Sequence, residues 1–305
     1  MKEIVFFNHF HNGDIHVSRE IVNKIINHVN ITFPGQYSFS YGHCNPSNLL
    51  NDINDLKYDS SALQVIKDPH LNLINVNNKT YINTWYAQQN YKYMNPYGMT
   101  MDCLYSALND SCQTLWGFSL SDISNDLSEF FPKIDYDKFE INAAKNWLSN
   151  HPEKKIFVAN GQAMSGQAVN FPMLPIIIKL AQKHSNKAFI LSNNEGNANL
   201  PFNVFYSSGI IAKNGLSDLN ENSYLSSHCD VIVGRSSGAS TFAMTQNNLF
   251  KRNIKILYFT NIVPIPPNKF WSDSIFRDKV NFSAEIINTN EHDPGQVWNL
   301  IDSKL

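Results

Sequence analysis

The chain has 305 residues, of which 43% are hydrophobic and 16% are charged. This balance excludes a disordered or collagen-like chain and supplies apolar side chains for two domains of roughly 150 residues each. The 24 Lys and Arg residues against 26 Asp and Glu residues give a formal net charge of -2. That charge argues against a protein whose main function is to bind a nucleic-acid backbone, because such proteins carry a basic excess.

The cysteines and the N-terminus give no sign of secretion. Four cysteines stand at 44, 103, 112 and 229 without C-x-x-C spacing, which predicts neither a disulfide framework nor a structural zinc site. Residues 1–14 lack the apolar segment and cleavage site of a signal peptide. No apolar run approaches the ~18–20 residues of a membrane span. We therefore expect a soluble, cytoplasmic protein.

The first half of the chain opens with an apolar run at 4–7, which is typical of a buried strand. A polar loop at 8–14 follows, and apolar residues then recur at helical spacing from 15 to 29. A strand, a glycine-containing loop and a helix are the start of a βα unit, from which doubly wound sheets are built. Further strands are predicted at 37–41, 71–76 and 80–85, and helices over most of 99–150.

The second half repeats this alternation of strands and helices. Strands are predicted at 155–160, 187–192, 202–206, 229–234 and 254–259, and helices over 173–184, from 241 onward and over 294–301. The pattern predicts two α/β domains, 1–150 and 151–305.

The loop after the first predicted strand holds three candidate catalytic residues, His9, His11 and Asp14. Ligands of open α/β sheets bind at the carboxyl ends of strands, so we expect chemistry here. Histidine titrates near neutral pH and a carboxylate accepts protons, so each of the three is a candidate general base. The alternative is that Asp14 caps its helix and the histidines are ordinary loop residues.

A second candidate site lies where the strand at 229–234 leads into a helix. Ser236, Ser237 and Gly238 offer free backbone N–H groups at a helix start, which suits a diphosphate, and Arg235 adds positive charge. A serine-rich helix cap is the alternative.

The same residues satisfy G-x-S-x-G, the nucleophile elbow of serine hydrolases, with Ser236 as nucleophile. In that fold an acid and a histidine follow the serine. Only His292 and four aspartates follow here, within 69 residues, which leaves little chain for the remaining strands and helices.

Three further segments carry weaker signals. The loop after the strand at 155–160 holds Asn160, Gln162 and Ser165, which suit hydrogen bonding to a nucleotide or sugar, although it matches no phosphate-loop pattern. Asp135-Tyr136-Asp137 has the D-x-D form of metal-dependent transferases, but its charged surroundings favour a solvated linker. The aromatic stretch 85–97 either stacks on sugars or bases or packs between core and solvent.

The arrangement resembles the heptosyltransferases, glycosyltransferase family 9. Gly13-Asp14 is similar to the family's Gly-Asp after its first strand, and 229–244 is similar to its strand followed by DTGxxHLA. Asn160-Gly161 with Ser165 resembles the start of its nucleotide-binding domain. The chain departs from the family at Ser236-Ser237-Gly238 and at Thr241-Phe242-Ala243, where the family has Asp-Thr-Gly and His-Leu-Ala.

The resemblance implies a GT-B fold, in which two Rossmann-like domains face each other across a cleft, and an inverting, metal-independent sugar transfer. The first domain would bind the acceptor and the second the nucleotide-sugar donor, with no further cofactor. Asp14 matches the general base, and His9 or His11 are alternatives for that role. Ser236, Ser237 and Gly238 would hold the diphosphate, and Asn193 would contact the nucleotide.

Three alternatives to transfer stay open: a serine hydrolase that uses Ser236, a nucleotide-sugar epimerase of the same fold, and a catalytically silent binding protein of that fold. The donor is not specified by the sequence. The acceptor is a glycan, a lipid-linked glycan, a protein or a modified DNA base, although the net charge gives no indication of nucleic acid.

Overall fold

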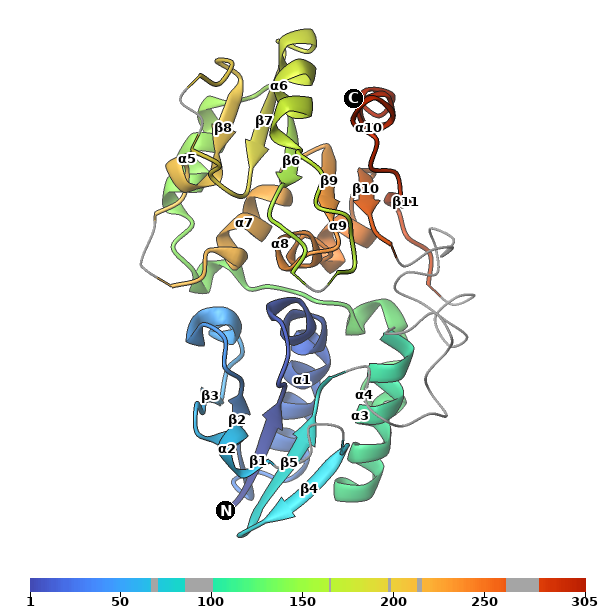
Figure 1. Ribbon diagram of the computed structural model, residues 1–305. Helices are drawn as coiled ribbons and strands as arrows, with labels where there is room; N and C mark the ends of the chain where they lie inside the picture. Colours follow the sequence, from blue (N-terminus) through green and yellow to red (C-terminus); the bar gives the residue numbers. More distant parts are fainter. Residues whose placement is uncertain (67–70, 86–100, 165, 197–198, 213–215, 262–279) are drawn as a thin grey trace. The chain divides into compact units, whose positions relative to one another are not determined.

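The computed structural model describes the chain apart from residues 67–70, 86–100, 165, 197–198, 213–215 and 262–279. The described residues divide into two compact units, each built on one sheet (Figure 1). The first unit contains Met1–Lys133 together with Val280 and Asn281, and the second contains the other described residues from Ile134 to Leu305.

The first unit is built on a sheet with strand order β3-β2-β1-β5-β4 in the described part of the chain, and β4 pairs antiparallel with β5. The central strand is apolar from Ile4 to Phe7, and all four side chains are fully buried. Such a continuous apolar run is what a strand covered on both faces requires. The strands are β1 (Lys2–Phe7), β2 (Tyr37–Gly42), β3 (Leu56–Tyr58), β4 (Leu73–Val76) and β5 (Lys79–Asn83).

Helices cover both faces of the first sheet. One face packs Val5 and Phe7 against the short helix α2, while α1 and α3 contact β2 and β5. The apolar residues predicted at helical spacing in 15–29 are buried along α1, which confirms that helix. The helices are α1 (Asn12–Thr32), η1 (Ser47–Leu50), α2 (Ala62–Val65), α3 (Met101–Trp116), α4 (Leu120–Ile123) and η2 (Leu127–Phe130).

The second unit is built on a parallel sheet with strand order β11-β10-β9-β6-β7-β8 among the described residues. The chain runs outward from β6 through β7 to β8, returns to the centre, and runs outward on the other side from β9. This is the doubly wound strand order. The strands are β6 (Lys154–Ala159), β7 (Lys187–Leu191), β8 (Val204–Tyr206), β9 (Val231–Arg235), β10 (Lys255–Phe259) and β11 (Glu285–Thr289).

The main core of the second unit lies between the sheet and two helices. Ile156 and Val158 on β6 pack in one buried cluster with Ile177 and Leu180 on α6 and with Val297 on α10. Helices α7 and α8 contact each other. In addition, α7 contacts β6 and α8 contacts β9. The helices are η3 (Tyr136–Lys138), α5 (Asn142–Asn150), α6 (Leu174–Lys183), η4 (Ser207–Gly209), α7 (Leu219–Ser226), α8 (Gly238–Phe242), α9 (Gln246–Phe250) and α10 (Pro294–Asp302).

The division between the units differs from the predicted boundary near residue 150. Residues 134–150 belong to the second unit because their aromatic side chains pack there. The Tyr136 ring lies 5.2 Å from that of Tyr224, and Trp147 packs edge-on against Phe205 with ring centroids 5.0 Å apart. The helix predicted from 241 begins earlier, at Gly238. Strands β3 and β11 and helix α7 were not predicted. None of the described helices is long and apolar enough to cross a bilayer.

Gly234 in β9 allows close packing between the sheet and α8. A Cβ atom at this position would lie 2.8 Å from the Cβ atom of Ser240 and 2.9 Å from that of Ala159. Both distances are shorter than van der Waals contact, so we expect Gly234→Ala to lower the free energy of unfolding by about 1–3 kcal/mol through overpacking.

Urea denaturation of the full chain measures this loss. Gly209→Ala is the matched control, because no atom lies within 4 Å of its added Cβ. The control is expected to leave the unfolding free energy unchanged or to raise it by less than about 1 kcal/mol. Equal stability of Gly234→Ala and the native chain would show that the packing at β9 is looser than described.

Candidate functional site

The doubly wound order of the second sheet defines where a ligand is expected. Strands β6 and β9 are neighbours, but the chain leaves them toward opposite edges of the sheet. At such a switch point the loops after the two strands separate, and a crevice opens at the carboxyl ends. The loop after β6 begins with Asn160, and β9 ends at Arg235. Two of the segments predicted to carry chemistry therefore meet at this point.

Arg235 connects these two segments through hydrogen bonds. Its side chain is 3% exposed. Nη1 donates to the carbonyl oxygens of Asn160 and Gly161, at 3.2 and 3.0 Å, and Nη2 donates to that of Phe171 at 2.8 Å. The guanidinium carbon also lies 5.1 Å from the centroid of the Phe171 ring. Burial lowers the pKa of Arg235, and the negative charge of Glu195 opposes this shift.

Arg235 thus places a positive charge at the switch point, and its terminal nitrogens bind main-chain carbonyls. In this arrangement it organises the loop after β6. Direct contact between Arg235 and a phosphate stays a prediction.

Asn160 connects the loop after β6 to the loop after β7. Its Nδ2 donates to the carbonyl oxygen of Asn193 at 2.8 Å and to Oε1 of Glu195 at 2.7 Å. Its Oδ1 accepts the Asn193 N–H at 2.8 Å. The structure therefore brings together Asn160 and Asn193, two residues that the sequence assigned to nucleotide contact. The side chain of Asn160 is buried, whereas Asn193 and Glu195 are exposed.

The residues after β9 differ in how accessible they are. Ser236 is buried, its N–H donates to the Phe259 carbonyl at 2.8 Å, and its hydroxyl donates to Oε1 of Gln167 at 3.1 Å. Ser237 and Gly238 are half-exposed. The structure confirms the alternative of a serine-rich cap, because the Ser237 N–H donates to Oγ of Ser240 at 3.2 Å and the two serines form a capping box at the start of α8. The first N–H groups of a helix have no main-chain acceptor within the helix, so diphosphate binding by Gly238 at the start of α8 stays a prediction.

The sequence analysis did not single out Gln167. Besides accepting from Ser236, its carbonyl oxygen accepts from the Asn261 N–H at 2.7 Å and from Thr260 Oγ1 at 3.1 Å. Gln167 therefore joins the loop after β6 to the chain after β9 and β10. Its place in a polar loop was visible in the sequence, but its partners were not. Gln162 is exposed, and Ser165 lies outside the described residues.

In the first unit, the three predicted catalytic residues lie in the loop after β1 and at the start of α1. Asp14 is 8% exposed, and its Oδ2 accepts the N–H of His11 at 3.0 Å. The alternative in which Asp14 caps its helix is confirmed, since His11 is the residue just before α1. His11 is exposed, and the half-buried His9 ring meets Phe7 edge-on at 5.7 Å. Capping does not exclude a role in catalysis.

Buried polar groups hold this first-unit loop in place. The Asn45 side chain donates to the Phe10 carbonyl at 2.8 Å, and Asn45 N–H donates to Nδ1 of His43 at 3.2 Å. Burial lowers the pKa of His43 to about 4, so its ring is neutral at physiological pH. The Phe10 ring stacks on Trp85, with centroids 3.9 Å apart. The rest of the predicted aromatic stretch, 86–97, lies outside the described residues.

The geometry around Ser236 does not match a nucleophile elbow. Its hydroxyl contacts Gln167 and, at 3.3 Å, the hydroxyl of Tyr258. No histidine of the described chain hydrogen-bonds to it. Ser236 is also absent from the described non-glycine residues with positive φ, which an elbow serine on a strained turn would join. The hydrolase alternative has no support here.

No group of three or more His, Cys, Asp and Glu side chains in the described part of the chain is arranged to hold a metal ion. The D-x-D segment forms the short helix η3, where Asp135 accepts the Asp137 N–H at 3.3 Å. Asp137 is exposed and pairs with Lys145 at 3.4 Å. This agrees with the predicted solvated segment.

Comparison with solved structures identifies the fold. A glycosyl transferase family 9 protein from Veillonella parvula DSM 2008 is 13% identical, with coverage of 100% of this chain and 90% of that one and a TM-score of 0.51. E. coli heptosyltransferase WaaC with ADP is 10% identical over 99% of this chain and 100% of that one, with a TM-score of 0.48. No family model and no curated protein sequence matches. The likeness to the Veillonella protein confirms the predicted fold, two α/β units of the GT-B class.

The position of Arg235 leads to a stability prediction. Arg235→Met removes three hydrogen bonds from a charged donor and leaves buried carbonyls unpaired. We expect the free energy of unfolding to fall by about 3 kcal/mol, measured by urea denaturation. Arg252→Met is the control, since Arg252 makes one long hydrogen bond, 3.4 Å to Asn248, and should cost about 0.5 kcal/mol. Equal losses of unfolding free energy in the two variants would contradict the role of Arg235 in connecting the two segments.

Proposed function

We propose that the protein transfers a sugar from a nucleotide-activated donor to an acceptor hydroxyl, with inversion and without a metal ion or further cofactor. The observation that carries the proposal is the convergence of polar loops at the switch point of the second sheet, in a chain with the GT-B fold. The cytoplasmic location is part of the same proposal.

The donor binds to the second unit in this proposal. The main-chain N–H of Gly238 and the hydroxyl of Ser237, at the start of α8, bind the diphosphate, and the buried charge of Arg235 adds to the positive potential there. Asn193 and Glu195, which Asn160 orients, contact the nucleoside. Such preorganised donors stabilise negative charge as it develops on the leaving group, which is the task that a divalent ion has in metal-dependent transferases.

The acceptor binds to the first unit, where Asp14 is the proposed general base. Its carboxylate takes the proton of the acceptor hydroxyl while the hydroxyl oxygen attacks the anomeric carbon. The bond from that carbon to the diphosphate oxygen breaks, and the nucleoside diphosphate leaves with the electron pair. Attack opposite the leaving group inverts the anomeric centre. His11, exposed and adjacent, and His9 are the alternatives for the base.

Asp14→Asn tests this assignment. The amide keeps the shape and the acceptor for the His11 N–H, but it takes no proton. We expect the rate of nucleoside diphosphate release in the presence of a hydroxyl acceptor to fall by about 10²–10⁴-fold, with an unchanged melting temperature. His11→Gln is the matched neighbour and should retain most of the rate. A loss in His11→Gln with full activity in Asp14→Asn would move the base to His11.

Nucleotide binding tests the donor site separately from the chemistry. Thermal melting with UDP, GDP, ADP, CMP and dTDP should show a raised melting temperature with one nucleotide, unchanged by EDTA. A ligand at 100 times its Kd adds about 2.7 kcal/mol to stability. The absence of a shift with every nucleotide would contradict the donor site, and a shift lost in EDTA would contradict metal independence. Conversion of a donor sugar without any acceptor would indicate an epimerase.

A further inference from the structure

The amino edge of the second sheet gathers lysines that are far apart in the sequence. Lys154 and Lys155 begin β6, Lys187 begins β7 and Lys255 begins β10, while Asp230 directly precedes β9. The strand order β10-β9-β6-β7 places these strand starts side by side. Lys154 and Lys187 occupy paired positions across β6 and β7. Four neighbouring strands thus begin with lysines and a single aspartate.

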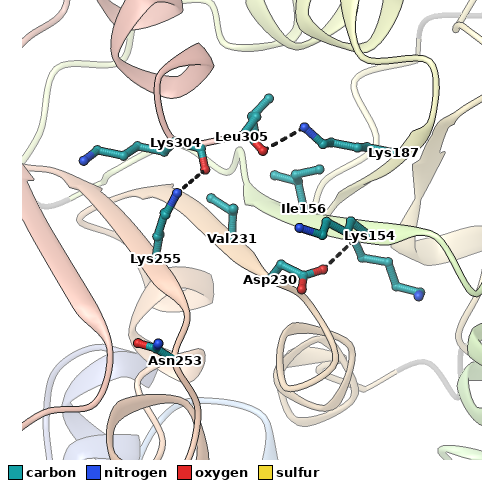
Figure 2. Close-up of a pocket in the computed structure, with 10 residues that line it drawn as sticks. Lys154, Ile156, Lys187, Asp230, Val231, Asn253, Lys255, Lys304 and Leu305 are labelled. Carbon is teal, nitrogen blue, oxygen red and sulfur yellow. Dashed lines mark hydrogen bonds between the residues drawn. The ribbon is translucent and has the colours of Figure 1, made fainter.

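These strand starts surround a cavity of about 160 Å³, which is closed on one side by Lys304 and Leu305 (Figure 2). The volume is well above the roughly 10–15 Å³ that one water molecule needs on this measure. It therefore has room for a phosphate-sized group with part of the molecule that carries it.

Main-chain oxygens accept hydrogen bonds from three of the ammonium groups at the cavity. Lys187 Nζ donates to the Leu305 main-chain oxygen at 2.7 Å, and Lys255 Nζ donates to that of Lys304 at 3.1 Å, as Figure 2 shows. Lys155, which is 8% exposed, donates to the Glu153 carbonyl at 2.8 Å. Lys187 Nζ also lies 3.4 Å from Nδ1 of His184. A lysine ammonium has three N–H donors, so each of the three lysines keeps at least one donor for a ligand.

The lining carries an excess of positive charge. Five lysines against Asp230 give a formal charge of +4, and the ion pair of Lys304 with Glu285, at 2.8 Å, reduces it to +3. Burial and the nearby charges of Lys154 and Lys255 lower the pKa of Lys187, and the carboxylates of Asp302 and Asp230 oppose this shift. An anion in the cavity would relieve this repulsion.

We propose that this cavity is a second ligand site, which binds a phosphate or diphosphate group through Lys155, Lys187 and Lys255. Tetrahedral oxyanions with two or more negative charges match several converging ammonium donors. The site is distinct from the proposed donor site, because it lies at the opposite end of the strands. Five residue steps along β6 separate the two edges by about 17 Å.

Calorimetric titration of the full chain with inorganic diphosphate tests the proposal. Lys187→Met/Lys255→Met should weaken this binding by at least about tenfold, because two charged donors are lost. Lys145→Met/Lys251→Met is the matched control, with the same change in charge at exposed positions of the same unit. The control should bind as the native chain does. Equal affinity of the two double variants would overturn the site.

A single variant and a vesicle-binding experiment complete the test. If the double variant does not fold, Lys255→Met alone leaves the Lys187 contact with Leu305 in place and should still weaken diphosphate binding.

Sedimentation with phosphatidylglycerol vesicles distinguishes the source of the phosphate. Vesicle binding lost in the lysine variants would identify a lipid headgroup, and diphosphate binding alone would identify a free ligand. The absence of both kinds of binding in the native chain would overturn the proposal.

Discussion

The buried guanidinium of Arg235 is the interaction on which the proposed donor site depends. It stands at the end of β9, the strand where the doubly wound sheet changes direction, and it binds the carbonyls of Asn160 and Gly161 after β6. Together with the hydrogen bond between Ser236 and Gln167, these bonds connect two loops that leave the sheet in opposite directions. Gly234 beside it permits the close approach of α8, whose first residues supply the main-chain donors.

In both units, polar residues follow directly after a buried apolar strand. In each, a central strand with fully buried apolar side chains ends in a short polar loop, after which a helix begins. In the first unit the loop after β1 carries His11 and leads to Asp14 at the start of α1. Asn45 holds this loop, and the Asn45 N–H donates to the buried, neutral His43. A proposed proton acceptor thus follows β1 in the first sheet and a proposed diphosphate site follows β9 in the second, each at the carboxyl end of a parallel strand.

Patterns that are local in sequence were sufficient to predict most of the framework. The apolar run from Ile4 to Phe7 and the helical spacing that follows it identified β1 and α1. Helix α7 was missed because several of its buried side chains, among them Asn220 and Ser223, are polar and give no apolar periodicity.

Contacts between distant segments could not be predicted. The contact between Arg235 and Phe171 joins segments 64 residues apart, and the lysine cavity appears only when the strand order is known. The earlier domain boundary, after Lys133, depends on the packing of Tyr136 and Trp147, which composition does not reveal.

Hydrogen–deuterium exchange of the full chain with a saturating nucleoside diphosphate is the most direct measurement of the central claim. The account predicts slower exchange in peptides that contain Asn160–Gly161, Asn193–Glu195 and Ser237–Gly238, with peptides from the β8 and β11 edges unchanged. A bound nucleotide that protects none of these three segments would contradict the placement of the donor at the switch point of the second sheet.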